Sequence, residues 1–223
     1  MALDVVYADA ALVVLHKPSG LLAVPGKTSN ECLSLQVQQQ FADALIVHRL
    51  DMATSGLMLM ARGIAAQRLL SAAFAERRVH KRYLAIVDGD CRQAAETSAS
   101  APDADGWHLI DQPIAVDWPR RPLRVIDPAA GKPSQTRWRW VQYDAERQAS
   151  LLELEPLTGR SHQLRVHLQA MGHPILGDTL YAPPAVQARS ARLLLHASEL
   201  GLAHPVSGAW LQLHCPAAFA AGA

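Results

Sequence analysis

Short apolar or alternating runs bounded by turn residues fill much of the chain, and such runs predict β-strands. Prolines at 113, 119, 122, 128 and 133 punctuate the middle of the chain. They keep the strands there short, because proline cannot donate to a strand ladder. We expect strands at residues 4–7, 11–15, 45–47, 57–61, 81–89, 114–118, 123–126, 136–143, 150–155, 193–203 and 210–214.

Apolar positions at helical spacing predict three helices, over residues 32–42, 64–77 and 162–171. The second helix has an expected buried stripe, which consists of Leu69, Leu70, Ala73 and Phe74. Many strands with few helices predict an α+β fold, with a mixed, largely antiparallel β-sheet and flanking helices. No internal repeat or linker divides the chain, so we expect a single domain over residues 1–223.

A polar turn between two apolar runs is the first candidate site. Residues 45–47 lead into the segment His-Arg-Leu-Asp-Met-Ala-Thr-Ser-Gly at 48–56, and residues 57–61 lead out of it. This pattern predicts strand, tight turn, strand, with Asp51 and Arg49 at the lip of the turn. Aspartate often only stabilises a turn, so this stretch alone leaves a structural and a chemical role for Asp51 equally open.

The helix expected at 162–171 is the second candidate site, because its first turn is unusually polar. At about 100° per residue, His162, Arg165 and Gln169 share one face. This face is either an ordinary solvated surface or a place where Arg165 reaches toward an anion.

Composition sets the broad class. The chain has 223 residues, of which 50% are hydrophobic and 18% charged, with a formal net charge of +1; these values are typical of a globular protein. The N-terminus lacks the basic start and apolar stretch of a signal peptide, and no apolar run has membrane-spanning length. The three cysteines are isolated, which indicates neither disulfides nor a metal knuckle. We therefore expect a reduced, cytoplasmic protein with no membrane partner.

Positive charge is concentrated locally despite the small net charge. Residues 77–82 read Arg-Arg-Val-His-Lys-Arg, and further arginines gather at 120, 121 and 124 and at 160 and 165. Local basic patches on a nearly neutral protein fit a site that grips a few phosphates, not a whole duplex. Each cluster taken alone also fits a solvated face.

Three ordered motifs carry a family resemblance. Residues 48–56, the Lys-Arg-Tyr-Leu-Ala segment at 81–85 and the Thr-Gly-Arg-Ser-His-Gln-Leu-Arg-Val-His segment at 158–167 resemble the three successive signatures of the RluA-type pseudouridine synthases. Residues 9–20 resemble the opening strand and Lys-Pro-x-Gly loop of that family, and residues 172–178 with 194–197 resemble its closing section. The resemblance covers nearly the whole chain. It implies a pseudouridine synthase fold with a central RNA-binding cleft, and one catalytic domain without an N-terminal S4 domain.

The resemblance also implies an activity and three catalytic residues. The reaction breaks the N-glycosidic bond of a uridine, rotates the base and joins C5 to C1′ of the ribose. Asp51 matches the catalytic aspartate of the family, Arg165 the arginine that keeps a desolvated Asp51 charged, and Tyr83 the tyrosine that stacks on the target base. Tyr83 is also a candidate for removing the C5 proton. This isomerisation needs no cofactor and no metal.

The expected partner is RNA, from which the target base must be flipped. Arg49 matches the arginine that enters the vacated space. The remaining RNA-binding candidates are Arg77, Arg78, Lys81, Arg82, Arg120, Arg121, Arg124, Arg160 and His162. The chain is most similar to the small family members, which implies a tRNA anticodon stem-loop, at position 32, and a 23S rRNA hairpin, at position 746, as substrates of a monomer.

Other readings are less consistent with the residues. A non-catalytic RNA-binding module would explain the basic clusters but not the Asp51 turn. A nucleoside or glycoside hydrolase needs a second carboxylate in a comparable setting, and a nucleobase deaminase needs His-x-Glu and Cys-x-x-Cys motifs; neither pattern occurs in the sequence. The spacing of His162, His167 and His173 matches no zinc motif.

Overall fold

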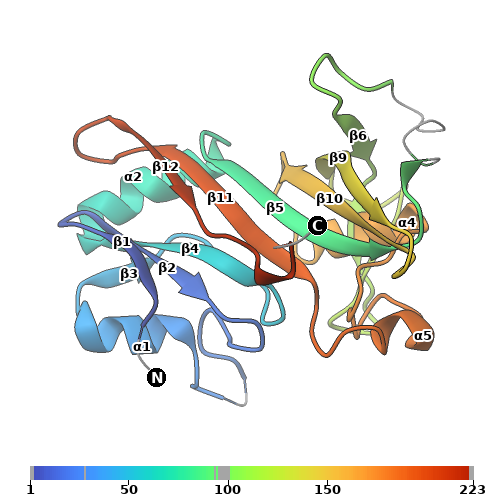
Figure 1. The fold of residues 1–223 in the computed structure, drawn as a ribbon. Coiled ribbons are helices and arrows are strands. Elements are labelled where there is room, and N and C mark those ends of the chain that lie inside the picture. Colours follow the sequence, from blue (N-terminus) through green and yellow to red (C-terminus); the bar gives the residue numbers. More distant parts are fainter. Residues whose placement is uncertain (1–2, 28, 93, 95–100, 221–223) are drawn as a thin grey trace. The chain divides into compact units, whose positions relative to one another are not determined.

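The computed structural model of the chain describes residues 3–27, 29–92, 94 and 101–220. They form two compact units (Figure 1). Unit 1 consists of Met1–Lys81 and His196–Ala217, and unit 2 of Arg82–Leu195 and Ala218–Ala223. Strands β5 and β11 each have residues in both units. The expectation of one catalytic domain stays a prediction.

Unit 1 is built on a mixed sheet in the order β1-β2-β4-β11, with β3 also pairing with β4 and β12 with β11. The β4–β11 pair is parallel and the other pairs are antiparallel. The strands are β1 (Val5–Ala8), β2 (Leu12–Lys17), β3 (Ala44–Ile46), β4 (Ser55–Arg62), β11 (Leu195–Ala203) and β12 (Trp210–His214), and the helices are α1 (Leu33–Gln40) and α2 (Gly63–Ala75). The expected final hairpin is confirmed as β11 and β12.

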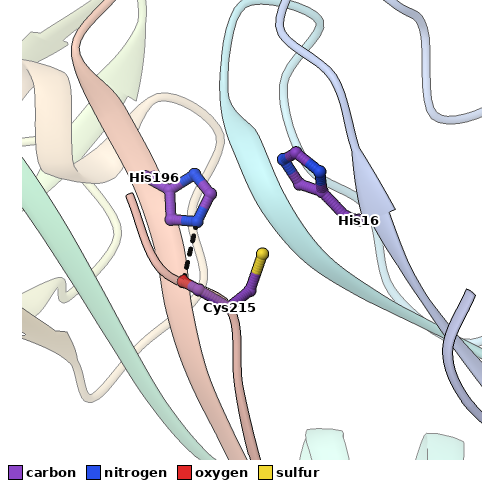
Figure 2. Close-up of side chains that lie close together, drawn as sticks. All are labelled: His16, His196 and Cys215. Carbon is purple, nitrogen blue, oxygen red and sulfur yellow. Dashed lines mark hydrogen bonds between the residues drawn. The ribbon is translucent and has the colours of Figure 1, made fainter. Parts of the chain in front are cut away.

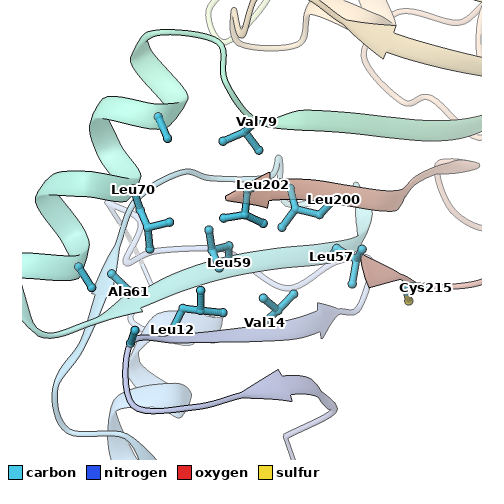
Figure 3. Close-up of a cluster of buried hydrophobic side chains, with 13 residues drawn as sticks. Leu12, Val14, Leu57, Leu59, Ala61, Leu70, Val79, Leu200, Leu202 and Cys215 are labelled. Atoms are coloured by element: carbon cyan, nitrogen blue, oxygen red, sulfur yellow. The ribbon is translucent and has the colours of Figure 1, made fainter. Parts of the chain in front are cut away.

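The core of unit 1 is formed by alternate residues of β2, β4 and β11 together with α2 (Figure 3). The buried stripe of α2 is Ala66, Leu70 and Ala73. The prediction that Leu69 belongs to this stripe is wrong, because its side chain is 53% exposed. At about 100° per residue, Leu69 lies about 100° from Leu70, on the outer side of Ala73, and therefore at the exposed edge of the stripe.

Gly56 on β4 lies against Ala197 on β11, where the two parallel strands are paired. Its φ is +111°, and a Cβ at this position would collide with the backbone of Ala197. The glycine at the end of the 48–56 motif therefore allows this pair of strands to approach each other.

Unit 2 contains an antiparallel sheet in the order β5-β10-β9-β6 and a separate β7–β8 hairpin. Its strands are β5 (His80–Asp88), β6 (His108–Asp111), β7 (Ile114–Val116), β8 (Arg124–Ile126), β9 (Gln135–Asp144) and β10 (Ala149–Pro156). Its helices are α4 (Gln163–Ala170), α5 (Pro184–Gln187) and the 3-10 turn η1 (Ala218–Ala220). The α+β fold with a mixed, largely antiparallel sheet is confirmed.

Strand β6, helix α5 and the 3-10 turn η1 of unit 2 have no counterpart among the predicted elements. Strand β6 has four residues and α5 also has four, and periodicity cannot be read from so few positions. The loop expected around residues 91–106 lies partly outside the described residues. Of its described part, residues 101–106 have no helix or strand, whereas residues 92 and 94 are helical, contrary to the expectation.

Candidate active site

The predicted strand, turn and strand around Asp51 are confirmed. β3 and β4 pair antiparallel, and the turn between them carries Asp51, whose carbonyl accepts a hydrogen bond from the Thr54 N–H at 3.1 Å. Asp51 is half-buried, Arg49 is exposed and Leu50 between them is buried. The turn thus presents an acid and a base at its surface while Leu50 anchors it in the interior.

Lys17 ties this turn to the loop that follows β2. Its side chain is completely buried, and its Nζ donates hydrogen bonds to the carbonyls of Pro18 at 2.9 Å, Leu21 at 2.7 Å and Met52 at 2.9 Å. Burial lowers the pKa of Lys17 to about 8, and the charge of Asp51 opposes this lowering. The ammonium group is therefore protonated at neutral pH, beside the turn that carries Asp51.

Two more hydrogen bonds connect the same loop and turn. The Ser19 hydroxyl donates to the carbonyl of Ala53 at 2.6 Å, and the Gly20 N–H donates to the carbonyl of Met52 at 2.9 Å. The Lys-Pro-Ser-Gly segment of the sequence is therefore the support of the Asp51 turn. Sequence reasoning noted this segment without assigning it that role.

His48 fixes the chain at the entrance of the turn. Its Nε2 accepts a hydrogen bond from the Leu59 N–H at 2.9 Å, and its ring stacks on Phe74 with centroids 4.5 Å apart. Desolvation, with a smaller contribution from Lys81, lowers the pKa of His48 to about 3. The imidazole is therefore neutral at physiological pH, with its proton on Nδ1, because Nε2 acts as the acceptor.

Tyr83 lies on β5 in unit 2, opposite Leu154 of β10. Neighbouring residues of a strand point to opposite faces, so Tyr83 and Arg82 face different sides of the sheet. Arg82 lies over the ring of buried Trp107, with Cζ 5.2 Å from the centroid. The strand therefore holds the half-buried Tyr83 ring on a rigid element.

Arg165 lies on α4 and is buried, with 4% of its surface exposed. Its Nε and Nη2 donate to the two carboxylate oxygens of Asp178 at 2.8 and 2.6 Å. A solvated polar face, one of the two readings of this helix, is wrong for Arg165, although Gln169 is exposed. Asp178 was not recognised as a site residue; its only sequence signal was its place in the closing segment of the family resemblance.

Most of the predicted phosphate-binding residues lie at the surface. In unit 1, Arg77 and Arg78 are exposed at the end of α2 and Lys81 is half-buried. In unit 2, Arg120 and Arg121 are exposed in the loop between β7 and β8, where Arg121 stacks over Trp118 at 3.6 Å. Arg120 is bound to buried Asp117, which orients it.

The other candidates of unit 2 differ from one another. Arg160 is exposed and Arg124 half-buried. His162 precedes α4 with a left-handed backbone, φ +59°, and its Nδ1 lies 2.7 Å from the Tyr181 hydroxyl. Arg124 donates its backbone N–H to the same hydroxyl at 2.9 Å. The structure thus brings His162 and the backbone of Arg124 together at Tyr181. The convergence of Asp51 with Tyr83 and Arg165 on one substrate stays a prediction.

One cluster of unit 1 has residue types that can bind a metal. A nitrogen of His16, a nitrogen of His196 and the sulfur of Cys215 lie within 4.8 Å of one another (Figure 2). The His196 nitrogens already contact the Ser55 hydroxyl at 2.9 Å and the carbonyl of Cys215 at 3.0 Å. Burial and the nearby Asp4 carboxylate raise the pKa of the Cys215 thiol. The arrangement fits a protonated thiol and a histidine that joins Ser55 of β4 to Cys215, the residue after β12.

Comparison with known proteins identifies the class. A model of the RNA pseudouridylate synthase family matches residues 11–170. The chain belongs to this family, and it is an RNA pseudouridine synthase, an isomerase.

The similar proteins match over nearly the full chain. The dual-specificity RNA pseudouridine synthase RluA of Escherichia coli (strain K12) is 43% identical over 97% of this chain and 94% of its own. The enzyme of the same name from Yersinia pestis is 43% identical over 96% of this chain and 99% of its own. Among solved structures, human RNA Pseudouridylate Synthase Domain Containing 1 matches with a TM-score of 0.78 and 28% identity, over 96% of this chain and 83% of that one.

Among the residues described, no helix has the length and apolar character needed to cross a membrane.

Proposed function

We propose that this pseudouridine synthase acts on two RNAs, a tRNA anticodon stem-loop at position 32 and a 23S rRNA hairpin at position 746. The similarity to enzymes named dual-specificity synthases, at 43% identity over 97% of the chain, supports this proposal. We also propose that the chain is one catalytic domain that works as a cytoplasmic monomer, without cofactor or metal.

The observation that carries the proposed chemistry is the support of the Asp51 turn. Cleavage of the bond between N1 and C1′ needs one carboxylate at the reacting uridine, whichever route it takes, and Asp51 supplies it. Lys17 holds the Met52 carbonyl from within the protein, so the backbone beside Asp51 is fixed before the RNA binds. Such preorganisation places the carboxylate without a further entropic cost at the moment of reaction.

Arg165 and Tyr83 complete the proposed catalytic set. Asp178 balances the charge of Arg165, so Arg165 contributes N–H groups held in a fixed direction more than a net positive charge. Lys17 is the buried cation whose charge interacts with Asp51 within unit 1. Tyr83 stacks on the flipped uracil and is a candidate for removing the proton that leaves C5.

The RNA contacts follow from the exposed arginines. We propose that Arg49, beside Asp51, enters the stack where the flipped base was. Arg77, Arg78, Lys81, Arg82, Arg120, Arg121 and Arg124 bind phosphates, and Arg160 and His162 are further RNA contacts. Each phosphate contact in single-stranded RNA contributes about 0.7 to the slope of log affinity against log salt.

Tritium release from RNA labelled at uridine C5 tests this proposal. The wild-type enzyme releases tritium from both stem-loops, and replacement of the target uridine by cytidine at either position abolishes the release from that RNA. Asp51→Asn abolishes release while RNA binding persists. Asp43→Asn removes a carboxylate of the same unit that is bound to Arg62 and serves as the matched control. Free uracil as a product would contradict the proposed isomerisation, and release from only one RNA would contradict dual specificity.

A further inference from the structure

The ion pair between Arg165 and Asp178 is unusually well enclosed. The side chains are 4% and 1% exposed, and two parallel N–H···O bonds join them. In the same unit the carboxylate of Glu153, which binds Arg139, is 21% exposed. Burying two charges costs several kcal/mol per ion, so stability alone gives little reason for this pair. A fixed geometry for the guanidinium is a better reason, because the bidentate arrangement fixes its plane and its direction.

Asp178 is itself held in place by the backbone that follows it. Its Oδ1 accepts the backbone N–H groups of Leu180 at 2.9 Å and Tyr181 at 3.1 Å. These bonds form an Asx-type turn, in which a short acidic side chain caps the following residues. The carboxylate that receives Arg165 is therefore rigid before Arg165 docks against it.

The same turn places Tyr181 beside Arg165. The ring centroid of Tyr181 lies 5.1 Å from the Arg165 Cζ. Its hydroxyl accepts the Arg124 N–H, at the start of β8, and contacts His162, at the start of α4. The carboxylate of Asp178 thus binds the edge of the Arg165 guanidinium, and the ring of Tyr181 packs against it. Both of these residues belong to one turn.

We propose that Asp178 is the positioning residue of Arg165 in the isomerisation, and that it acts on the reaction only through that arginine. The inference rests on the proposed catalytic role of Arg165. Without the carboxylate, the guanidinium keeps its charge but loses the two bonds that set its direction. A misplacement of about 1 Å in a catalytic group can reduce a rate about 100-fold.

The experiment measures single-turnover tritium release and RNA affinity for Asp178→Asn, Arg165→Ala and the double variant. We expect each single variant to slow the reaction by about 10- to 100-fold, with less than about a threefold change in RNA affinity. The double variant is as slow as Arg165→Ala alone, because Asp178 has no second route to the reaction. Glu153→Gln, which breaks an arginine–carboxylate pair of the same unit, is the matched control and keeps the wild-type rate.

Chemical rescue separates positioning from a merely structural role. Guanidinium added at millimolar concentration, far below the range that unfolds proteins, restores part of the activity of Arg165→Ala, because Asp178 can bind it in the vacated place. The double variant is not rescued. Rescue of the double variant, or losses that multiply in it, would overturn the inference.

The remaining outcomes distinguish this inference from the proposed function. A wild-type rate for Arg165→Ala would refute the catalytic role of Arg165, and the role of Asp178 with it. A slow Arg165→Ala together with a wild-type rate for Asp178→Asn would refute only the role of Asp178. If Asp178→Asn does not fold, Asp178→Glu takes its place. It keeps the charge but moves the carboxylate by one methylene, and we expect a lower rate at unchanged RNA affinity; a wild-type rate would contradict positioning.

Discussion

Replacement of Lys17 by methionine tests how much the buried ammonium group stabilises unit 1. The substitution keeps an unbranched side chain of similar length and removes three hydrogen bonds from Nζ to the carbonyls of Pro18, Leu21 and Met52. Hydrogen bonds with a charged partner contribute about 1.5–3 kcal/mol each. Against this, burial lowers the pKa of Lys17 from 10.5 to about 8. That change corresponds to a cost of about 3 kcal/mol for keeping the charge inside.

The balance of these terms is a net loss of about 3 kcal/mol in the free energy of unfolding, within the range for breaking a buried charged contact. For a slope of about 2–3 kcal/mol per molar urea, the midpoint of urea unfolding falls by about 1–1.5 M. Lys27→Met removes an exposed lysine of the same unit, and we expect its midpoint to change little. The rate of tritium release falls as well, because the Met52 carbonyl beside Asp51 loses one of its two hydrogen-bond donors and keeps only the Gly20 N–H.

The pH dependence gives the sign of the Lys17 contribution. The pKa of Lys17 is about 8 in the folded protein and about 10.4 in the unfolded chain. Between these values the unfolded state binds more protons, so Lys17 makes stability rise with pH. The stability difference between the wild type and Lys17→Met therefore widens from pH 8 to pH 10. An unchanged midpoint for Lys17→Met, or a difference that narrows over this range, would refute the reasoning.

Two further predictions concern α2 and His48. Leu70→Ala lowers the free energy of unfolding by about 3 kcal/mol, because Leu70 is 1% exposed. Leu69→Ala, at a position that is 53% exposed, changes it by less than about 1 kcal/mol. Equal losses of the two variants in urea unfolding would contradict the burial of this face of α2. The pKa of His48 is about 3 in the folded protein and about 6.5 in the unfolded chain. The contribution of His48 to the free energy of unfolding is therefore complete above pH 6.5 and is lost as the pH falls. The melting temperature of the wild type therefore decreases from pH 7 to pH 4.5 more steeply than that of His48→Gln; parallel curves would show that His48 does not become harder to protonate on folding.

The elements that the sequence predicts well are those in which one pattern decides the structure. The apolar runs on either side of Asp51 predict β3 and β4, and the spacing of Leu70 and Ala73 predicts the buried side of α2. Leu69 was misplaced because a leucine next to the stripe looks the same in the sequence as one inside it. Strand β6 has too few positions for any period to be read.

The site residues show a different limit. Asp51, Tyr83 and Arg165 stand out through the family motifs, but the partners that hold them do not. Lys17 stands in the Lys-Pro-x-Gly segment of the family resemblance, but only the structure shows it buried against three carbonyls. Asp178 lies 13 residues after Arg165, in a turn with no periodic pattern. Such contacts depend on the three-dimensional path of the loops, which local sequence patterns do not predict.

The parallel pairing of β4 with β11 has a consequence for the order of folding. Gly56 pairs with Ala197, so this contact joins positions that are 141 residues apart, like the nearby Ser55–His196 hydrogen bond. The core of unit 1 includes Leu200, Leu202 and Cys215 (Figure 3). During synthesis the first strands of unit 1 therefore emerge long before β11, the strand that pairs with β4. Closing so long a loop is slow, and the Asp51 turn belongs to the unit that has to wait for this pairing.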